Sequence, residues 1–140
     1  MRFWDSSALV PLCLQQPRTA PALRWLEEDP EQVVWWGSAV ECASAIARLH
    51  RDGHLTDDAE AAARDLLSTL QASWFEVQPA EAVREQALRL LRLHPLRVAD
   101  ALQLAAAVTW GGSPPAGTLL TFDERLAAAA RREGFARPAR

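Results

Sequence analysis

The segment Gly117-Thr118-Leu119-Leu120-Thr121-Phe122-Asp123-Glu124-Arg125-Leu126 decides how the rest of the chain folds. A short apolar run follows a Pro/Gly turn, ends in Thr121 and Asp123, and passes into an Ala-rich helix over residues 124–132. This pattern is typical of a buried parallel strand that brings a carboxylate to its carboxyl end. Ligands of open α/β sheets bind at that edge. The segment therefore predicts a fold class and the place of a functional site.

The N-terminal segment Met1-Arg2-Phe3-Trp4-Asp5-Ser6-Ser7-Ala8-Leu9 repeats this pattern. A short apolar stretch precedes Asp5, two small hydroxyl residues follow, and an apolar helix is predicted over residues 7–14. Further strands are predicted over residues 33–36 and 74–77, and further helices over residues 19–28, 38–51, 57–71, 80–93 and 98–108. Alternating strands and helices indicate an α/β fold with a mostly parallel sheet flanked by helices. A chain of 140 residues fits one domain, residues 1–140.

The composition is that of a globular protein, with 49% hydrophobic and 24% charged residues. No apolar run approaches the ~20 residues of a membrane span, and no secretion signal precedes the first strand, so we expect a cytoplasmic protein without a membrane partner. The net charge of −3 argues against binding nucleic acid by bulk attraction, although local contacts stay open. All fifteen basic residues are Arg, which excludes Lys-dependent chemistry such as a P-loop or a Schiff base.

Four acids share one kind of position: each lies at the carboxyl end of a strand or in the first turns of a helix. They are Asp5, Glu41, Asp100 and Asp123. If the first and fourth strands are neighbours, all four face one pocket. Two carboxylates ~4 Å apart repel by about 4 kcal/mol at an effective dielectric constant near 20, so such a cluster needs cations. Oxygen-only ligands favour Mg²⁺ or Mn²⁺, which support hydrolysis of a phosphodiester without a side-chain nucleophile.

Two of the acids also have a simpler interpretation as helix-start residues. Asp5 is suited to cap the first helix. Glu41 follows Ser38 with the Ser-x-x-Glu spacing of a capping box. The spacing alone does not separate these structural roles from metal binding.

The other two acids have structural alternatives as well. Asp100 and Gln103 fit the polar stripe of a helix that is apolar nearly all round. Asp123 lies in a first helical turn, where it favours the helix dipole, and Thr121 with Glu124 has the spacing of a second capping box. The simpler alternative is therefore a protein-binding module in which the acids only stabilise the starts of helices.

Four segments together resemble the PIN domain, specifically the VapC-type toxins: residues 5–9, Glu41, residues 96–105 (Leu-Arg-Val-Ala-Asp-Ala-Leu-Gln-Leu-Ala) and residues 120–126. The resemblance spans nearly the whole chain, and the four segments follow the family's order. It implies a Rossmann-like sandwich with strand order 3-2-1-4-5 and a homodimer. It also implies Mg²⁺- or Mn²⁺-dependent cleavage of RNA, restrained by a VapB-like antitoxin. A DNA nuclease of the wider PIN-like group is the remaining alternative.

The resemblance also assigns residues. The family's catalytic and metal-binding acids match Asp5, Glu41, Asp100 and Asp123, and Ser7 and Thr121 match hydroxyl positions that steady the acids or a bound water. One departure concerns residues 135–140, where the family has a last strand of β-branched residues and this chain has Phe-Ala-Arg-Pro-Ala-Arg. The residues themselves therefore do not predict the fifth strand.

Contacts with RNA are expected from two arginines close to the acids. Arg97 precedes Asp100, and Arg125 lies one turn from Asp123. A guanidinium can bind a phosphate through two hydrogen bonds. The tryptophans are predicted to lie mostly in the core, with Trp35 and Trp36 on opposite faces of one strand, and no stacking platform for bases is apparent.

Overall fold

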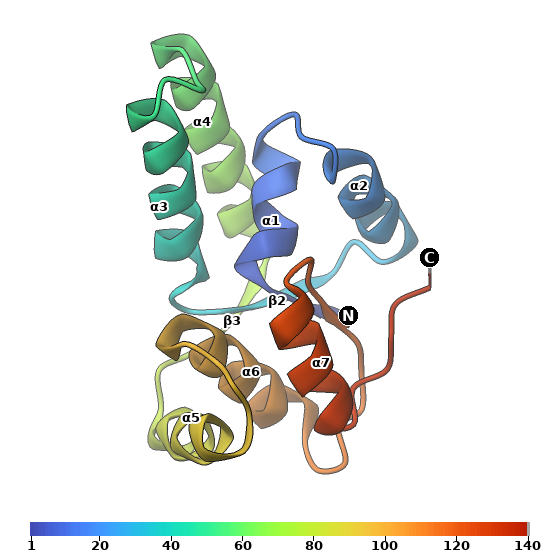
Figure 1. Ribbon diagram of the computed structural model, residues 1–140. Coiled ribbons are helices and arrows are strands. Elements are labelled where there is room, and N and C mark those ends of the chain that lie inside the picture. The colour runs from blue at the N-terminus through green and yellow to red at the C-terminus, as the bar shows by residue number, and fades with distance from the viewer. Residues whose placement is uncertain (140) are drawn as a thin grey trace.

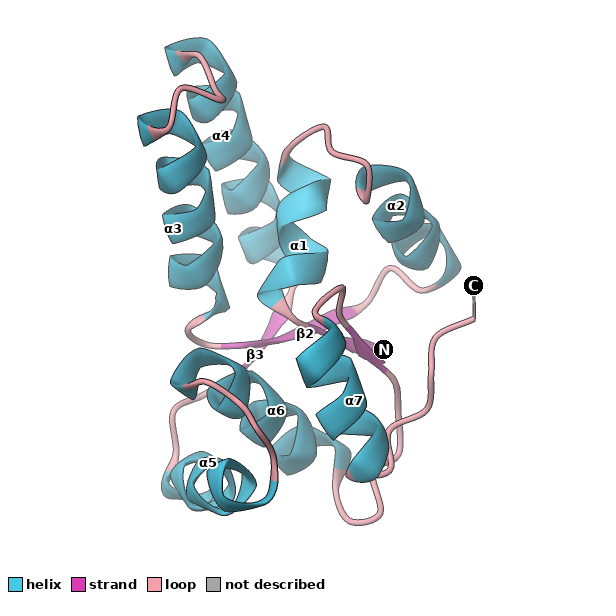
Figure 2. Ribbon diagram, viewed as in Figure 1, coloured by secondary structure: helices cyan, strands magenta, loops and turns pink. Residues whose placement is uncertain are grey.

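The computed structural model describes residues 1–139, which form a parallel four-stranded sheet with the strand order β3-β2-β1-β4 (Figures 1 and 2). The strands are β1 (Arg2–Trp4), β2 (Gln32–Trp35), β3 (Phe75–Val77) and β4 (Leu119–Leu120). The helices are α1 (Ser6–Cys13), α2 (Thr19–Glu28), α3 (Ser38–Arg51), α4 (Asp57–Ser73), α5 (Glu81–Leu93), α6 (Val98–Gly111) and α7 (Glu124–Arg132). The predicted fold class, an α/β sandwich with a parallel sheet, is confirmed.

Successive strand residues bury their side chains on opposite faces of the sheet. Phe3 belongs to a core formed with α5, α6 and α7, whereas Trp4 belongs to a core formed with α1 to α4. Strands β2 and β4 alternate in the same way between the two cores. Figure 1 shows the two helical layers on either side of the sheet. Because both faces are covered, β1, β2 and β4 contain consecutive apolar residues rather than a polar–apolar alternation. Arg2 and Gln32 are the polar first residues of β1 and β2, and Glu76 lies in the edge strand β3.

The pairing of β1 with β4 places two strand ends side by side. Phe3 pairs with Leu119, and Trp4 with Leu120. The backbone N–H of Asp5 then donates to the carbonyl of Leu120 at 3.0 Å. The loop that carries Asp123 thus leaves the sheet beside Asp5, as expected if the first and fourth strands are neighbours.

The fifth strand that the family resemblance implies does not form within the described residues. Within residues 1–139 the segment after α7 contributes one isolated parallel bridge, between Thr118 and Ala136. Pro138 has no N–H to donate to a ladder, and the segment lacks the β-branched residues that favour strands. Arg140, the last residue of that segment, lies outside the described residues.

Both predicted capping boxes are also wrong. Helix α3 is preceded by Gly37, and Ser38 is its first residue rather than its cap. Helix α7 is capped by Asp123, whose carboxylate accepts a hydrogen bond from the N–H of Leu126 at 2.9 Å, and not by Thr121. Among the helices of residues 1–139, none has the length and apolar character needed to cross a membrane.

Candidate active site

Four acidic side chains from four different elements line one cavity of about 860 Å³. Asp5 follows β1 and caps α1, and Asp123 follows β4 and caps α7. Glu41 and Asp100 lie in the first turns of α3 and α6. The structure therefore brings together the four acids that the sequence named, although they are up to 118 positions apart in the chain (123 − 5 = 118).

Asp5 is held rigidly by hydroxyl groups. Its Oδ2 atom accepts hydrogen bonds from Ser7 Oγ at 2.6 Å, Thr121 Oγ1 at 2.8 Å and the Ser7 N–H at 3.2 Å. The side chain is almost completely buried, and this burial raises its pKa above the ordinary value, while the hydrogen bonds from Ser7 and Thr121 act in the opposite direction. A buried carboxylate with its charge partly compensated is a costly arrangement unless a cation also binds it.

The two hydroxyls are themselves fixed by the loop that follows β4. Ser7 Oγ accepts from the N–H of Phe122 at 2.9 Å, and Thr121 Oγ1 accepts from the N–H of Asp123 at 3.0 Å. Each hydroxyl thus accepts a backbone hydrogen bond and donates to Asp5. The structure places Ser7 and Thr121 where the resemblance assigned them a steadying role.

Glu41 is positioned by a fully buried amide. Gln103 Nε2 donates to Glu41 Oε2 at 2.7 Å, and Ser6 Oγ lies 3.4 Å from Glu41 Oε1. Burial raises the pKa of Glu41 to about 7. The hydrogen bond from Gln103 opposes this rise, and the charges of Asp5 and Asp100 add to it.

Gln103 is a positioning residue that sequence reasoning placed only in a polar stripe. Its Nε2 also lies 3.0 Å from Ser38 Oγ, so this one amide joins α6 to two residues of α3. The signal in the sequence was the spacing of Asp100 and Gln103, which puts both side chains on one face of a helix. Asp100 and Gln103 thus lie on one face of α6, as the polar-stripe interpretation expects. That interpretation did not identify Glu41 and Ser38 of α3 as the residues that Gln103 binds.

Asp100 is affected by the charges of two acids and two arginines. Burial raises its pKa, and the charges of Asp123 and Asp5 raise it further. The guanidinium groups of Arg97 and Arg125 act in the opposite direction. Both arginines line a second cavity, of about 520 Å³, together with Asp100 and Asp123. The two arginines named from the sequence therefore flank the acids.

The walls of the larger cavity are mostly apolar. Trp36, Val40, Val98 and Leu102 line it together with the acids. Trp36 is 50% exposed because β2 ends at Trp35, so the prediction that Trp36 is a core residue is wrong. Val98 is 67% exposed, although its helix is apolar nearly all round. Exposed apolar side chains around a charged centre indicate a surface that a partner covers.

The donor set fits a hard divalent cation. The groups that face one another are carboxylates, with hydroxyl oxygens next to them, which is the ligand chemistry of Mg²⁺ and Mn²⁺. Three of the acids carry a raised pKa for which burial is the main cause, and for two of them the charges of the others add to it. Bound cations would remove this repulsion. Asp5, Glu41, Asp100 and Asp123 are the residues that would hold them.

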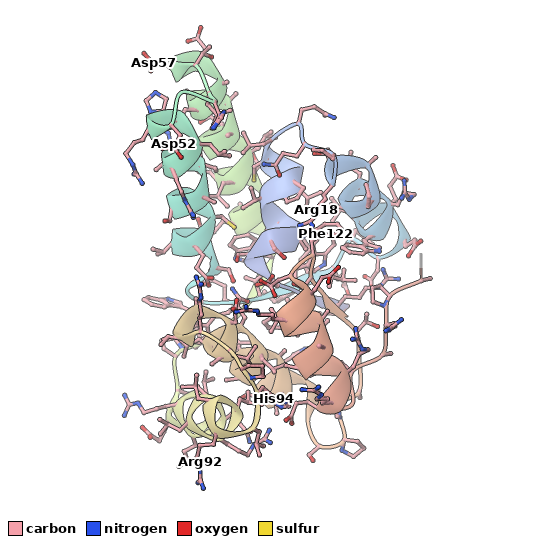
Figure 3. The ribbon with its side chains drawn as sticks, viewed as in Figure 1. Arg18, Asp52, Asp57, Arg92, His94 and Phe122 are labelled. Carbon is pink, nitrogen blue, oxygen red and sulfur yellow. The ribbon has the colours of Figure 1, made fainter. Side chains whose placement is uncertain are left out.

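A second group of metal-ligand residues lies elsewhere, where α3 meets α4. It consists of His50, Asp57 and Glu60, whose ligand atoms lie within 4.8 Å of one another. His50 Nε2 is 2.7 Å from Asp57 Oδ1, and Nδ1 is 3.1 Å from Glu60 Oε2. Figure 3 shows Asp57 at the end of the helical pair farthest from the sheet. These contacts join the two helices, and we assign the group no metal.

The sequence matches the PIN domain family model over residues 2–132. The chain belongs to the PIN domain family. The predicted family membership is thereby confirmed, and the match covers both strand–aspartate segments and all four acids. A comparison with curated protein sequences finds no match.

Several solved structures resemble this PIN domain, among them one toxin and one toxin–antitoxin complex. One is VapC20 of Mycobacterium tuberculosis, a toxin that cleaves the sarcin–ricin loop, with a TM-score of 0.69, 22% identity and 97% of each chain covered. The other belongs to a toxin–antitoxin complex from Klebsiella pneumoniae, with a TM-score of 0.64, 16% identity and 91% of each chain covered. At these identities the likeness establishes the shared fold.

Proposed function

We propose that this PIN domain is a metal-dependent endoribonuclease and the VapC-type toxin of a type II toxin–antitoxin pair. The observation that carries the proposal is the convergence of Asp5, Glu41, Asp100 and Asp123 on one cavity at the carboxyl ends of the strands. Both similar structures named above are toxins or come from a toxin complex, which supports the toxin assignment, and the toxin that cleaves the sarcin–ricin loop favours RNA over DNA as the substrate. We place the protein in the cytoplasm, where its RNA substrate is made.

In the proposed reaction the acids, the hydroxyl residues and the arginines have different roles. Mg²⁺ or Mn²⁺, when bound, would activate a water for attack on the phosphorus and neutralise charge on the phosphate oxygens. The four acids would hold the cation, and Ser7 and Thr121 keep Asp5 in one orientation. Arg97 and Arg125 bind the phosphates on either side of the cleaved bond.

The test is cleavage by the purified protein freed of any antitoxin. With Mg²⁺ or Mn²⁺ we expect it to cut RNA, and with EDTA we expect cutting to stop, because oxygen ligands alone offer no nucleophile. Gel analysis of a labelled RNA measures both. Undiminished cleavage in EDTA would contradict the metal mechanism, and no cleavage under any metal would favour the protein-binding module.

The same cavity suits the antitoxin. Its apolar wall of Trp36, Val40 and Val98 leads to the acids, so a segment with apolar side chains and one arginine complements it in shape and charge. We propose that a VapB-like antitoxin lies in this cavity and offers an arginine to the acids. Binding would then block the metal site directly.

We further propose that the toxin is a homodimer. Helix α5 exposes three leucines, Leu88, Leu91 and Leu93, on a monomer that has no described partner for them. We expect light scattering to give twice the mass of the 15.4 kDa chain. Leu88→Asp should shift the equilibrium to monomer, whereas Arg64→Asp, an exposed arginine of α4 in an ion pair with Glu60, should not. A wild-type monomer throughout the micromolar range would contradict the proposal.

A further inference from the structure

A stack of two aromatic rings and a guanidinium involves Phe122, which directly precedes Asp123 in the chain. The ring of Phe122 is stacked on Trp25 of α2, with centroids 4.7 Å apart and planes at 20°. The Arg18 guanidinium lies over the Phe122 ring, with its carbon 5.2 Å from the ring centroid. Trp4 packs edge-on against Trp25 from the core. Figure 3 shows Arg18 and Phe122 side by side between α2 and the start of α7.

We propose that Arg18, Phe122 and Trp25 form a nucleotide-binding subsite for single-stranded RNA. In this subsite a base stacks on Phe122 and Arg18 binds an adjacent phosphate. The proposal deepens the ribonuclease function proposed above and rests on it. It differs from the sequence-based expectation, in which no stacking platform for bases was apparent.

The subsite is tied to the acids through the backbone. Phe122 lies between Thr121 and Asp123, and its N–H donates to Ser7 Oγ at 2.9 Å. Ser7 in turn donates to Asp5 at 2.6 Å. A base on the Phe122 ring would therefore be held by the same loop that carries Asp123. This coupling fixes the position of a nucleotide relative to the reacting phosphate.

The charge distribution supports a nucleic-acid ligand. The cluster of acids repels phosphates, so an RNA strand needs cations on both sides of it. Arg97 and Arg125 supply cations on the side of α6 and α7. Arg18 precedes α2, which packs on the opposite face of the sheet from α6 and α7, and it supplies a cation on that face. It is exposed and forms no ion pair with any residue of 1–139, so its charge is available.

The present contact of Arg18 is easily exchanged for a base. Phe122 is partly exposed, and Trp25 beneath it is buried, so the ring has a rigid support and an accessible surface. An exposed cation–π contact is weaker than stacking of a base on an aromatic ring. A base can thus displace the guanidinium, which then reaches a phosphate. Stacking of this kind tolerates all four bases, because each has a flat aromatic face.

The experiment measures binding rather than cleavage. Two fluorescein-labelled ten-nucleotide RNAs are compared by anisotropy: oligo(A), and an abasic RNA with the same number of phosphates. Ca²⁺ replaces Mg²⁺, since it accepts oxygen ligands with a different coordination, and a gel verifies that the probes stay intact. We expect wild type to bind oligo(A) about 5- to 100-fold more tightly than the abasic RNA. Phe122→Leu, which keeps the apolar volume, should bind the two RNAs alike.

Arg18→Gln provides a second variant at an exposed position. It tests the proposed subsite even if Phe122→Leu does not fold. It should weaken binding of both RNAs and reduce the slope of log K against log salt by about one. The matched control is Arg24→Gln, which removes one exposed arginine from α2 and should leave that slope as in wild type. Melting curves check that each variant is folded.

Three results would overturn the subsite: equal binding of both RNAs to wild type, including binding of neither; a preference for oligo(A) that persists in Phe122→Leu; or an Arg18→Gln variant that behaves like Arg24→Gln. These outcomes are separate from failure of the nuclease. A protein that prefers oligo(A) yet cuts no RNA with Mg²⁺ or Mn²⁺ keeps the subsite and loses the proposed reaction.

Discussion

Replacing any one of the four acids by its amide should reduce metal-dependent RNA cleavage by at least about 10²-fold, because a bound cation contributes several kcal/mol of charge stabilisation in the transition state. The variants are Asp5→Asn, Glu41→Gln, Asp100→Asn and Asp123→Asn. Initial rates with a labelled RNA in Mg²⁺ and in Mn²⁺ measure the effect.

The amides preserve the structural roles of these residues. Asn caps a helix as well as Asp does, so Asp5→Asn and Asp123→Asn keep their hydrogen bonds to the N–H groups of Ser7 and Leu126. Gln at position 41 still accepts from the amide of Gln103. If the acids only stabilised the starts of helices, the four substitutions would change stability and activity little. Loss of activity in folded variants would therefore show that cleavage requires the negative charges of the carboxylates.

Melting temperatures give a second readout that does not depend on activity. In EDTA, removing one carboxylate relieves repulsion, so each variant should melt at the wild-type temperature or above it. A saturating metal at 100 times its Kd stabilises a protein by about 2.7 kcal/mol. Mg²⁺ or Mn²⁺ should raise the melting temperature of wild type more than that of any of the four variants.

The control for these variants is Asp58→Asn. Asp58 is an exposed acid in the first turn of α4, so its substitution changes net charge equally at a site far from the cavity. It should leave both cleavage and the metal-induced stabilisation unchanged. If Asp5→Asn and Asp123→Asn retain the wild-type values of both, the proposed metal site is wrong.

The parts of the fold that depend on local patterns were predictable from the sequence. Apolar runs that end in Asp5 and Asp123 indicated two strands, and the alternation of elements indicated a parallel sheet. In a parallel sheet the strand ends share one edge, so the meeting of these two aspartates followed from their place in the chain.

The remaining site features depend on tertiary packing. Nothing in the sequence around Glu41 shows that Gln103, 62 positions away, holds its carboxylate. The end of β2 at Trp35 decides that Trp36 is exposed, and a shift of one residue reverses such a prediction. The stack on Phe122 requires α2 to fold back onto the loop after β4. The local pattern of apolar and polar residues does not predict these contacts.

The stability of the metal-free protein should fall as pH rises from about 4.5 to about 7, and Glu41 should account for a large part of this fall. The pKa of Glu41 is 4.5 in its ordinary environment and is raised to about 7 here, mainly by burial. In this window the unfolded chain has lost the proton that the folded protein keeps. The unfolded state then binds fewer protons, so the free energy of unfolding decreases with pH.

The raised pKa values of Asp5 and Asp100 act with the same sign, starting at the lower ordinary value of 3.8. Because Glu41 keeps part of its surface exposed and water screens its charge, we expect its contribution to be about 1–2 kcal/mol rather than the full value of the shift. Glu41→Gln removes the titrating group. Urea unfolding in EDTA at several pH values should give a flatter profile for this variant than for wild type.

Glu133→Gln supplies a control of opposite sign. Burial acts to raise the pKa of Glu133, but hydrogen bonds from Arg89 and His94 outweigh it and leave the pKa below its ordinary value of 4.5. This group stabilises the fold above that pH and loses its effect as pH falls. Its removal should therefore lower stability at pH 7 and leave it nearly unchanged at low pH. A Glu41→Gln profile as steep as that of wild type would contradict the charge repulsion on which the metal site is argued.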